Sequence, residues 1–226
     1  MYKILLLASC LFFLVIATDA NAQSVDEKYA TQPEIKGIVR HSLIHWLDPY
    51  LPSAQVGLDY KIAPRKYLRH DVGYFFDIGY DEPRGLIGIN GIRLRNGYRK
   101  YDQSPRRLGR LTYIEFNLDY RYLDLLIAGD FERDNFNFQQ RINYSVWQHS
   151  LTANVQTGFF RHINEHWRLD LGFGLGLRVN YREYSSIPDN AEYRTNGPYL
   201  GWDYGSRPGL SLGMNIPIVV AIAYQW

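Results

Sequence analysis

The amino-acid sequence predicts an all-β fold, an eight-stranded antiparallel up-and-down transmembrane β-barrel. The first observation is in the last seventeen residues, 210–226, where every even position is apolar and all but one of the odd positions are small or polar. A period of two over this length indicates one extended strand with one apolar face. Soluble strands usually run about 5–6 residues, so this strand is better matched to crossing a bilayer at a tilt. The second observation is that this alternation recurs in seven earlier segments. The third is that the connections between the segments alternate in length.

The N-terminus has the features of a cleaved secretory signal peptide. Lys3 provides a positive start, residues 4–16 form an apolar run, and Ala20-Asn21-Ala22 is a small-x-small cleavage site. Lipidation at Cys10 is the alternative, but the apolar run continues beyond that residue. Cleavage after Ala22 leaves no cysteine, so disulfides and cysteine-ligated metals are excluded from the mature chain. The predicted organisation is a signal peptide at 1–22, a short periplasmic segment at 23–34 and the barrel at 35–226.

Composition narrows the class of partner. The formal net charge is +2 and no basic block stands apart from acidic neighbours, which argues against a nucleic-acid ligand. No run of about 18 apolar residues follows the signal peptide, so a membrane helix is not expected. The chain contains 19 Tyr, 11 Phe and 5 Trp, a richness in aromatic residues that suits the girdles at membrane interfaces.

Each of the eight expected strands has one apolar face and one face of small or polar residues. In the seventh, Leu169, Leu171 and Phe173 alternate with Asp170 and Gly172. The first strand has the least regular pattern. An even number of strands is usual in single-chain bacterial barrels. The expected strands lie near residues 35–46, 54–62, 68–78, 92–99, 112–122, 147–159, 167–181 and 210–226.

The connections between these strands predict the orientation of the barrel. If both ends of the mature chain are periplasmic, the short connections fall on the periplasmic side and the long ones fall outside, as in outer-membrane barrels. The expected short connections are 63–66, 102–109 and 161–166, and the expected long ones are 77–91, 123–144 and 184–209, with 48–52 as a short first external loop.

A secreted soluble barrel of lipocalin type is the competing fold. It alternates as well, with its apolar face turned inward around a ligand. The asymmetry of the connections, the aromatic residue at position 226 and the aromatic residues at strand ends favour the membrane. Apolar residues lining the inside of the barrel would favour the soluble alternative.

Several segments resemble a known group of proteins. The run Val56-Gly57-Leu58-Asp59-Tyr60-Lys61 before Pro64-Arg65, the run Gly97-Tyr98-Arg99-Lys100-Tyr101 and the alternating strand at 171–178 are similar to small outer-membrane barrels common in Bacteroidota. The resemblance spans most of the mature chain. It implies a barrel fold and a place in the bacterial outer membrane, and it implies no activity.

The inward-facing positions of the predicted strands carry charges of both signs. An eight-stranded barrel is just wide enough to be filled by its own side chains, so we expect these charges to pair and to plug the lumen, because an isolated buried charge is very costly. A conducting or proton-passing path is the alternative. The expected lumen charge network consists of Asp59, Lys61, Arg69, Asp71, Arg93, Arg95, Arg99, Glu115, Asp119, Arg121, Asp170 and Arg178.

A lipid-modifying enzyme, an acyl hydrolase or acyltransferase, is the alternative function. It needs a hydroxyl nucleophile beside a histidine base. His149 and Ser150 are adjacent on one strand and therefore point to opposite faces. His41, Ser42 and His45 lie on the irregular first strand, where the two histidines also have a loose metal-ligand spacing. We therefore expect no catalytic, cofactor-binding or metal-binding residues. Two further histidines, His162 and His166, lie at an expected periplasmic turn. We expect this turn to be far from the outer leaflet, where such an enzyme would act.

The two long late connections are the expected sites of partner binding. Residues 123–144 carry acidic and aromatic side chains, and residues 184–209 are rich in Tyr, Gly, Pro and Asn, a composition typical of adaptable recognition surfaces. We expect either a structural role or the binding of an extracellular or periplasmic protein partner. Outer-membrane lipid and the barrel-assembly machinery are also expected partners, the latter through the C-terminal assembly-strand residues Ile222, Tyr224 and Trp226.

Two further expectations concern the faces of the barrel. Pro217 lacks a backbone donor, yet the apolar parity is the same before and after it, so we expect the last strand to continue without a bulge and to lose one hydrogen bond to the first or seventh strand. Aromatic girdles are expected from Tyr60, Tyr98, Phe159, Trp167, Tyr224 and Trp226 on the periplasmic side and from Tyr80, Tyr120, Trp147 and Tyr181 on the outer side.

Overall fold

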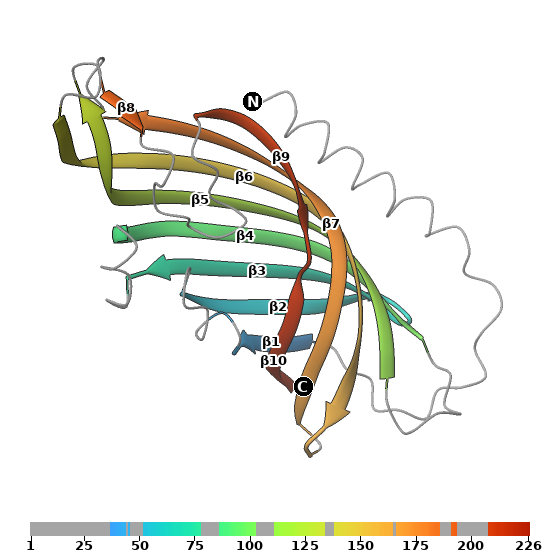
Figure 1. Cartoon of the computed structure of the whole chain (residues 1–226). Helices are drawn as coiled ribbons and strands as arrows, with labels where there is room; N and C mark the ends of the chain where they lie inside the picture. The colour runs from blue at the N-terminus through green and yellow to red at the C-terminus, as the bar shows by residue number, and fades with distance from the viewer. Residues whose placement is uncertain are drawn as a thin grey trace. The chain divides into compact units, whose positions relative to one another are not determined.

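The computed structural model describes residues 37–43, 45, 52–77, 86–102, 111–133, 138–164, 166–185, 191–193 and 208–226 (Figure 1). The predicted signal peptide and the segment 23–34 lie outside the described residues. The strands are β1 (Gly37–Ser42), β2 (Ser53–Ala63), β3 (Lys66–Phe76), β4 (Leu86–Asp102), β5 (Leu111–Arg133), β6 (Phe138–His162), β7 (Trp167–Ser185), β8 (Ala191–Tyr193), β9 (Gly209–Asn215) and β10 (Ile218–Gln225).

The long strands form a closed antiparallel ring. Each of the strands from β1 to β6 pairs with the next along the chain. Both β9 and β10 pair with β7, and β10 pairs with β1, which closes the ring. Because β9 and β10 lie end to end against β7, they are two halves of one strand, and the barrel has the eight strands expected from the sequence. No helix in the described part of the chain is long and apolar enough to span a bilayer.

Pro217 sits between β9 and β10 without a bulge. Asn215 lies opposite Gly176 and Ile218 lies opposite Phe173, so the register against β7 is the same on both sides of the proline. The N–H of Gly174 donates to the carbonyl of Pro217 at 2.9 Å. Proline has no N–H, so the second hydrogen bond of this residue pair, from position 217 to the carbonyl of Gly174, cannot form. The sequence expectation is therefore confirmed, and the missing bond falls on the seventh strand.

The two faces of the ring have opposite chemistry. Outward side chains of β7 and β9 are apolar and widely exposed, as with Leu212 at 74% and Leu175 at 60%. Inward side chains include buried charges such as Arg99, Glu115 and Asp170. This arrangement excludes the soluble alternative, whose inner face is apolar. An apolar outer band around a polar interior is the architecture of an outer-membrane β-barrel, because a closed ring satisfies its backbone without water. The protein is an outer-membrane β-barrel.

The expected long connection at 123–144 is wrong. Strand β5 continues to Arg133 and β6 begins at Phe138, so only 134–137 remain between them. The sequence suggested a loop because both faces there carry apolar residues and the acidic groups break the alternation. In the structure the same two-residue period continues with an apolar inward face, while the outward face of β5 mixes Asp124, Asp130 and Glu132 with Leu126 and Ala128.

The reversal occurs at one level of the register in neighbouring strands. On β5 the outward residues change from Tyr122 to Asp124, while the inward residues change from Arg121 to Leu123. On β6, where Leu123 faces Gln148, the inward residues change from Gln148 to Val146. An apolar inner face with a polar outer face is typical of a sheet in water. Beyond this level β5 and β6 continue as an extension whose inward face is mostly apolar, up to Arg133 on β5 and from Phe138 on β6.

The other two long connections are partly strand as well. Strand β4 begins at Leu86, inside the expected connection 77–91. Within 184–209, the three residues of β8 pair with β5 at Phe131–Arg133. Residues 186–190 and 194–207 lie outside the described part of the chain, so the expected recognition surface there is not described.

Aromatic residues line the outward face at strand ends. The rings of Trp167 and Tyr224 lie 5.3 Å apart beside the β6–β7 turn. At the level of the polarity reversal, His149 lies opposite both Tyr122 and Tyr181. Tyr98, expected in the periplasmic girdle, has the outward parity of Leu94 and lies opposite Leu68 and Phe116, and only 3% of it is exposed. Tyr80 lies outside the described residues.

Candidate functional site

The interior of the barrel is the candidate site, and an aromatic layer closes the end near the short β2–β3 and β6–β7 turns. Tyr67, Tyr101, Tyr113 and Phe160 face inward at this end and are buried. Their rings meet at centroid distances of 5.1 to 6.1 Å. The guanidinium of Arg168 lies over the Phe160 ring at 4.0 Å. This floor of rings in edge-to-face and tilted contact, with one cation, leaves little room for water.

Arg99 links the floor to the charges above it. Its guanidinium lies 3.8 Å from the centre of the Tyr113 ring. It donates to Asp170 at 3.0 Å and also to Glu115. The Tyr113 hydroxyl donates to Asp170 at 2.7 Å. The side chain of Arg99 is fully buried, so its charge is balanced by these carboxylates and not by solvent.

Asp71 is the centre of the next layer. Its carboxylate accepts hydrogen bonds from Arg40 at 3.1 Å and from Arg69 at 2.8 Å, and Arg95 lies 3.8 Å away. Arg69 also donates to Glu115 at 2.7 Å. One carboxylate therefore stands among three guanidinium groups from β1, β3 and β4.

Asp119 on β5 is the upper acceptor of the network. It accepts hydrogen bonds from Arg93, and Arg95 lies 3.3 Å from the same oxygen. The two arginines face it from β4, where Arg95 is its direct register partner. Alternation places these residues inward, and the register of β4 against β5 brings the opposite charges together.

The structure places the predicted lumen residues as follows. Nine of the twelve form the ion pairs just described or join them through Asp59, which accepts from Arg40 at 2.6 Å. Arg121 is buried, and Arg178 is buried and donates to Thr152 and Asn215. Lys61 is half-buried.

Sequence reasoning missed several members of this interior, among them Arg40, Tyr113 and Arg168. Arg40 belongs to the irregular first strand, although Val39 and Arg40 already alternate there. Tyr113 was overlooked because aromatic residues at strand ends resemble girdle residues. Its odd number, shared with Glu115 on the same strand, was the signal that it faces inward. Arg168 had the inward parity of Asp170 and was not recognised as part of the network.

Apolar side chains close the other end of the interior. Leu123, Leu125 and Ile127 on β5 pack with Phe75 and Val146 from neighbouring walls, together with further residues of the extension. Between this cap and the charges lies a layer of amides and hydroxyls, in which Gln148 donates to Ser150 and Ser150 donates to Asn180. The buried charges are thus enclosed between an aromatic floor and an apolar cap.

Glycines make room for this filling. A Cβ at Gly57 would collide with the Asp71 carboxylate, and a Cβ at Gly158 or Gly172 would collide with the Tyr113 hydroxyl. Small residues thus stand beside large inward ones. The alternation of small and large residues lets a narrow barrel fill completely.

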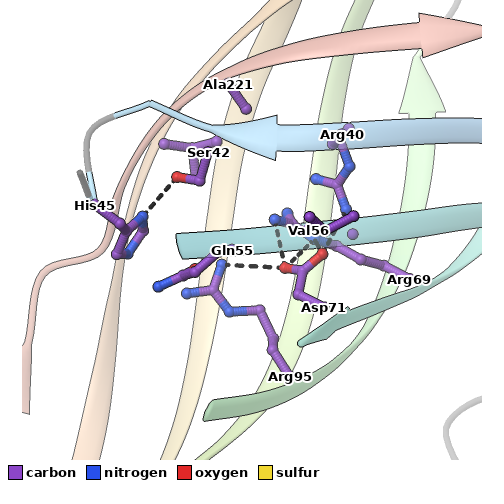
Figure 2. A pocket seen from close by; sticks show the side chains of 11 residues that line it. Arg40, Ser42, His45, Gln55, Val56, Arg69, Asp71, Arg95 and Ala221 are labelled. Atoms are coloured by element: carbon purple, nitrogen blue, oxygen red, sulfur yellow. Dashed lines mark hydrogen bonds and ion pairs between the residues drawn. The ribbon is translucent and has the colours of Figure 1, made fainter. Parts of the chain in front are cut away.

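A small pocket remains at the end of β1, lined by Arg40, Arg69, Arg95, Asp71 and Ser42 among others (Figure 2). At its rim the Ser42 hydroxyl lies 2.5 Å from Nδ1 of His45. This is the serine–histidine contact that a hydrolase would need, between residues the sequence analysis had only noted as neighbours.

The second nitrogen of His45 decides what this contact can do. Arg93 Nη1 lies 2.8 Å from His45 Nε2. A guanidinium can only donate, so Nε2 accepts and the single ring proton sits on Nδ1, which donates to Ser42. In this arrangement His45 cannot remove the Ser42 proton. His149 and Ser150 point to opposite faces as expected, toward Tyr120 and Asn180 respectively.

Comparison with known proteins assigns the chain to no family. No family model and no curated protein matches it. Two solved structures are similar in fold. Neisserial surface protein A has a TM-score of 0.41 and 11% identity over 85% of this chain and 96% of its own. A major outer membrane protein from Thermus thermophilus has a TM-score of 0.48 and 13% identity over 84% of this chain and 98% of its own.

Proposed function

We propose that this protein is a non-conducting outer-membrane barrel that serves as a structural element and binds a partner through its extension above the membrane. The observation that carries the proposal is the closed interior. A floor of packed aromatic rings, a layer of paired charges and an apolar cap follow one another along the lumen. Side chains packed in this way leave no continuous aqueous path, because each layer fills the width of a small barrel.

Conductance tests the closed lumen directly. Purified protein in planar bilayers should give no steady conductance, and the matched control should be a variant with the floor removed, Tyr113→Ala with Phe160→Ala. If the control conducts and the parent does not, the floor is the barrier. Stable open channels in the parent protein would refute the proposal.

The outward face of the extension is the proposed partner surface. Asp124, Asp130 and Glu132 on β5 share this face, and Asp130 is exposed. Polar side chains on a rigid hairpin are suited to recognition. A photo-crosslinking residue at position 130 should give a discrete adduct in intact cells, whereas the same residue at Phe131, which faces the cap, should give none. The absence of adducts at each of the three outward acidic positions would contradict this surface.

A lipid-modifying enzyme is the alternative function, and the contact between Ser42 and His45 is the observation that raises it. The proton arrangement imposed by Arg93 argues against it. Purified protein should therefore release no fatty acid from phospholipid or lipopolysaccharide. Turnover that Ser42→Ala abolishes would establish the enzyme and overturn this part of the proposal.

A further inference from the structure

The outward face of the neighbouring strands β5, β6 and β7 (Figure 1) carries a tryptophan between two carboxylates. Trp147 on β6 lies opposite Asp124 on β5 and opposite Glu183 on β7. Side chains that face each other across neighbouring strands lie about 4.5–5.5 Å apart at Cβ, so the indole ring has one carboxylate on each side. The Tyr181 hydroxyl donates to Glu183 at 2.8 Å and holds that carboxylate in the row.

Neither carboxylate has a basic register neighbour in the described part of the chain. The second neighbour of Asp124 is Asn90 on β4, and the strand partner of Glu183 is Trp147 itself. Trp147 is 36% exposed, and Glu183 is exposed as well. An exposed indole ring flanked by two carboxylates attracts a cation, because the negative face of the ring and the carboxylate charges act in the same direction.

The acidic row lies just beyond the end of the apolar outward band. On β6 and β7 that band ends at Leu151 and Val179. The next row consists of Tyr122, His149 and Tyr181, and the acidic row follows it. Outward apolar side chains of this barrel face hydrocarbon, and Tyr and Trp at the edge of such a band lie among lipid headgroups. The outward residues that follow on β6 and β7 are polar, namely Ser145, Asn143 and Ser185.

The row of Tyr122, His149 and Tyr181 is suited to a phosphate. The Tyr120 hydroxyl lies 2.9 Å from Nδ1 of His149. When this hydroxyl donates, the ring proton is on Nε2, which then joins the Tyr122 hydroxyl as a donor on the outward face. Apolar side chains, neutral donors and carboxylates beside an indole ring thus follow one another along the strands. This is the order of an acyl chain, a phosphate and an ammonium group.

We propose that the patch formed by Tyr122, Asp124, Trp147, His149 and Glu183 binds the headgroup of an ammonium-bearing phospholipid. The ammonium group lies against the Trp147 ring between the two carboxylates, and the phosphate accepts hydrogen bonds from Tyr122 and His149. The acyl chains lie on the apolar band next to these rows. A basic protein segment would match the acidic row alone, whereas the lipid matches all three rows.

Fluorine-19 NMR of protein labelled with 5-fluorotryptophan measures this site. In nonionic maltoside micelles, dihexanoylphosphatidylethanolamine should shift the Trp147 resonance saturably, and dihexanoylphosphatidylglycerol, which has no ammonium group, should not. Trp147→Phe assigns the resonance. Trp167 and Trp226, which are exposed at the β6–β7 turn and at the C-terminus, should not respond differently to the two lipids.

Neutral isosteres of the two carboxylates test the assignment of the ammonium group. Asp124→Asn combined with Glu183→Gln should lower the apparent affinity for phosphatidylethanolamine by about fivefold. The matched control is Asp130→Asn, which removes an exposed carboxylate of the same β5 face that lies opposite Arg141 and not opposite a tryptophan; its affinity should stay within about twofold. The heat-dependent gel shift verifies that each variant is folded. If the double variant does not fold, Glu183→Gln alone should weaken binding by about twofold in its place.

Three results would overturn the proposal. They are the absence of a saturable Trp147 shift with phosphatidylethanolamine, an equal shift with phosphatidylglycerol, and an equal affinity in the parent and in the carboxylate variant. A Trp147 shift produced by trilysine and not by the lipid would also overturn it and would assign the patch to a basic protein segment.

Discussion

Arg99→Met tests whether the charged side chains in the lumen are shielded from water. Arg99 is fully buried and makes two charge-assisted hydrogen bonds, to Glu115 and to Asp170 at 3.0 Å. Each such bond contributes about 1.5–3 kcal/mol. Methionine fills much of the same volume but leaves the carboxylates uncompensated, and breaking a buried pair from one side costs about 3–5 kcal/mol. We expect the free energy of unfolding to fall by that amount.

The residual contacts set the size of this effect. Glu115 keeps its bond from Arg69, whereas Asp170 keeps only the Tyr113 hydroxyl and Arg40 at 3.5 Å. Adding Asp170→Asn to Arg99→Met should therefore restore about 1–2 kcal/mol, because it removes the less compensated charge.

Urea unfolding in lipid vesicles, followed by tryptophan fluorescence and by the heat-dependent gel shift, measures both variants. Arg161→Met, an exposed arginine, is the control and should leave the unfolding curve unchanged. If Arg99→Met costs less than about 1 kcal/mol, water reaches the network and the sealed interior is refuted.

Four other substitutions test the remaining assignments. Pro217→Ala should be neutral, since it only restores a donor toward β7, whereas Val220→Arg on the lipid face should cost roughly 2–4 kcal/mol near the midplane; a block in assembly for the proline variant with normal folding of the arginine variant would reverse the two faces. Gly57→Val should push the Asp71 carboxylate off its arginines and lower the urea midpoint, and an unchanged midpoint would show that the carboxylate can move freely. Leu125→Asp should open the cap and expose the extension to protease while the heat-dependent gel shift remains, and equal protease resistance would contradict a separate apolar cap.

Alternation along the chain predicted all eight strands and both faces of most of them. It succeeded because a side chain's face depends only on residue parity, which is local. It failed where the environment changes along one strand. At Leu123 and Val146 the inward face changes from polar to apolar, and the expected pattern ends although the strands do not.

The sequence predicted which charged residues face the lumen, but it did not predict which of them pair with one another. The list of inward charges was read from parity, so Asp59 and Arg99 were both expected inside. Their partners were not predictable, because a hydrogen bond such as that between Arg40 and Asp59 depends on strand register and on the lengths of side chains across the lumen. The first strand was too irregular to show that Arg40 belongs to the network.

The sequence by itself determined the alternation, the number of membrane strands and the continuity of the last strand through Pro217, because these follow from local parity and from the lengths of segments. Only the tertiary structure decided that Asp71 is shared by three arginines, that Tyr113 and Phe160 close the floor, and that β5 and β6 stay paired beyond the change in polarity. Those features arise when ring closure brings together strands that are distant in the chain, and no local pattern records which residues will then meet.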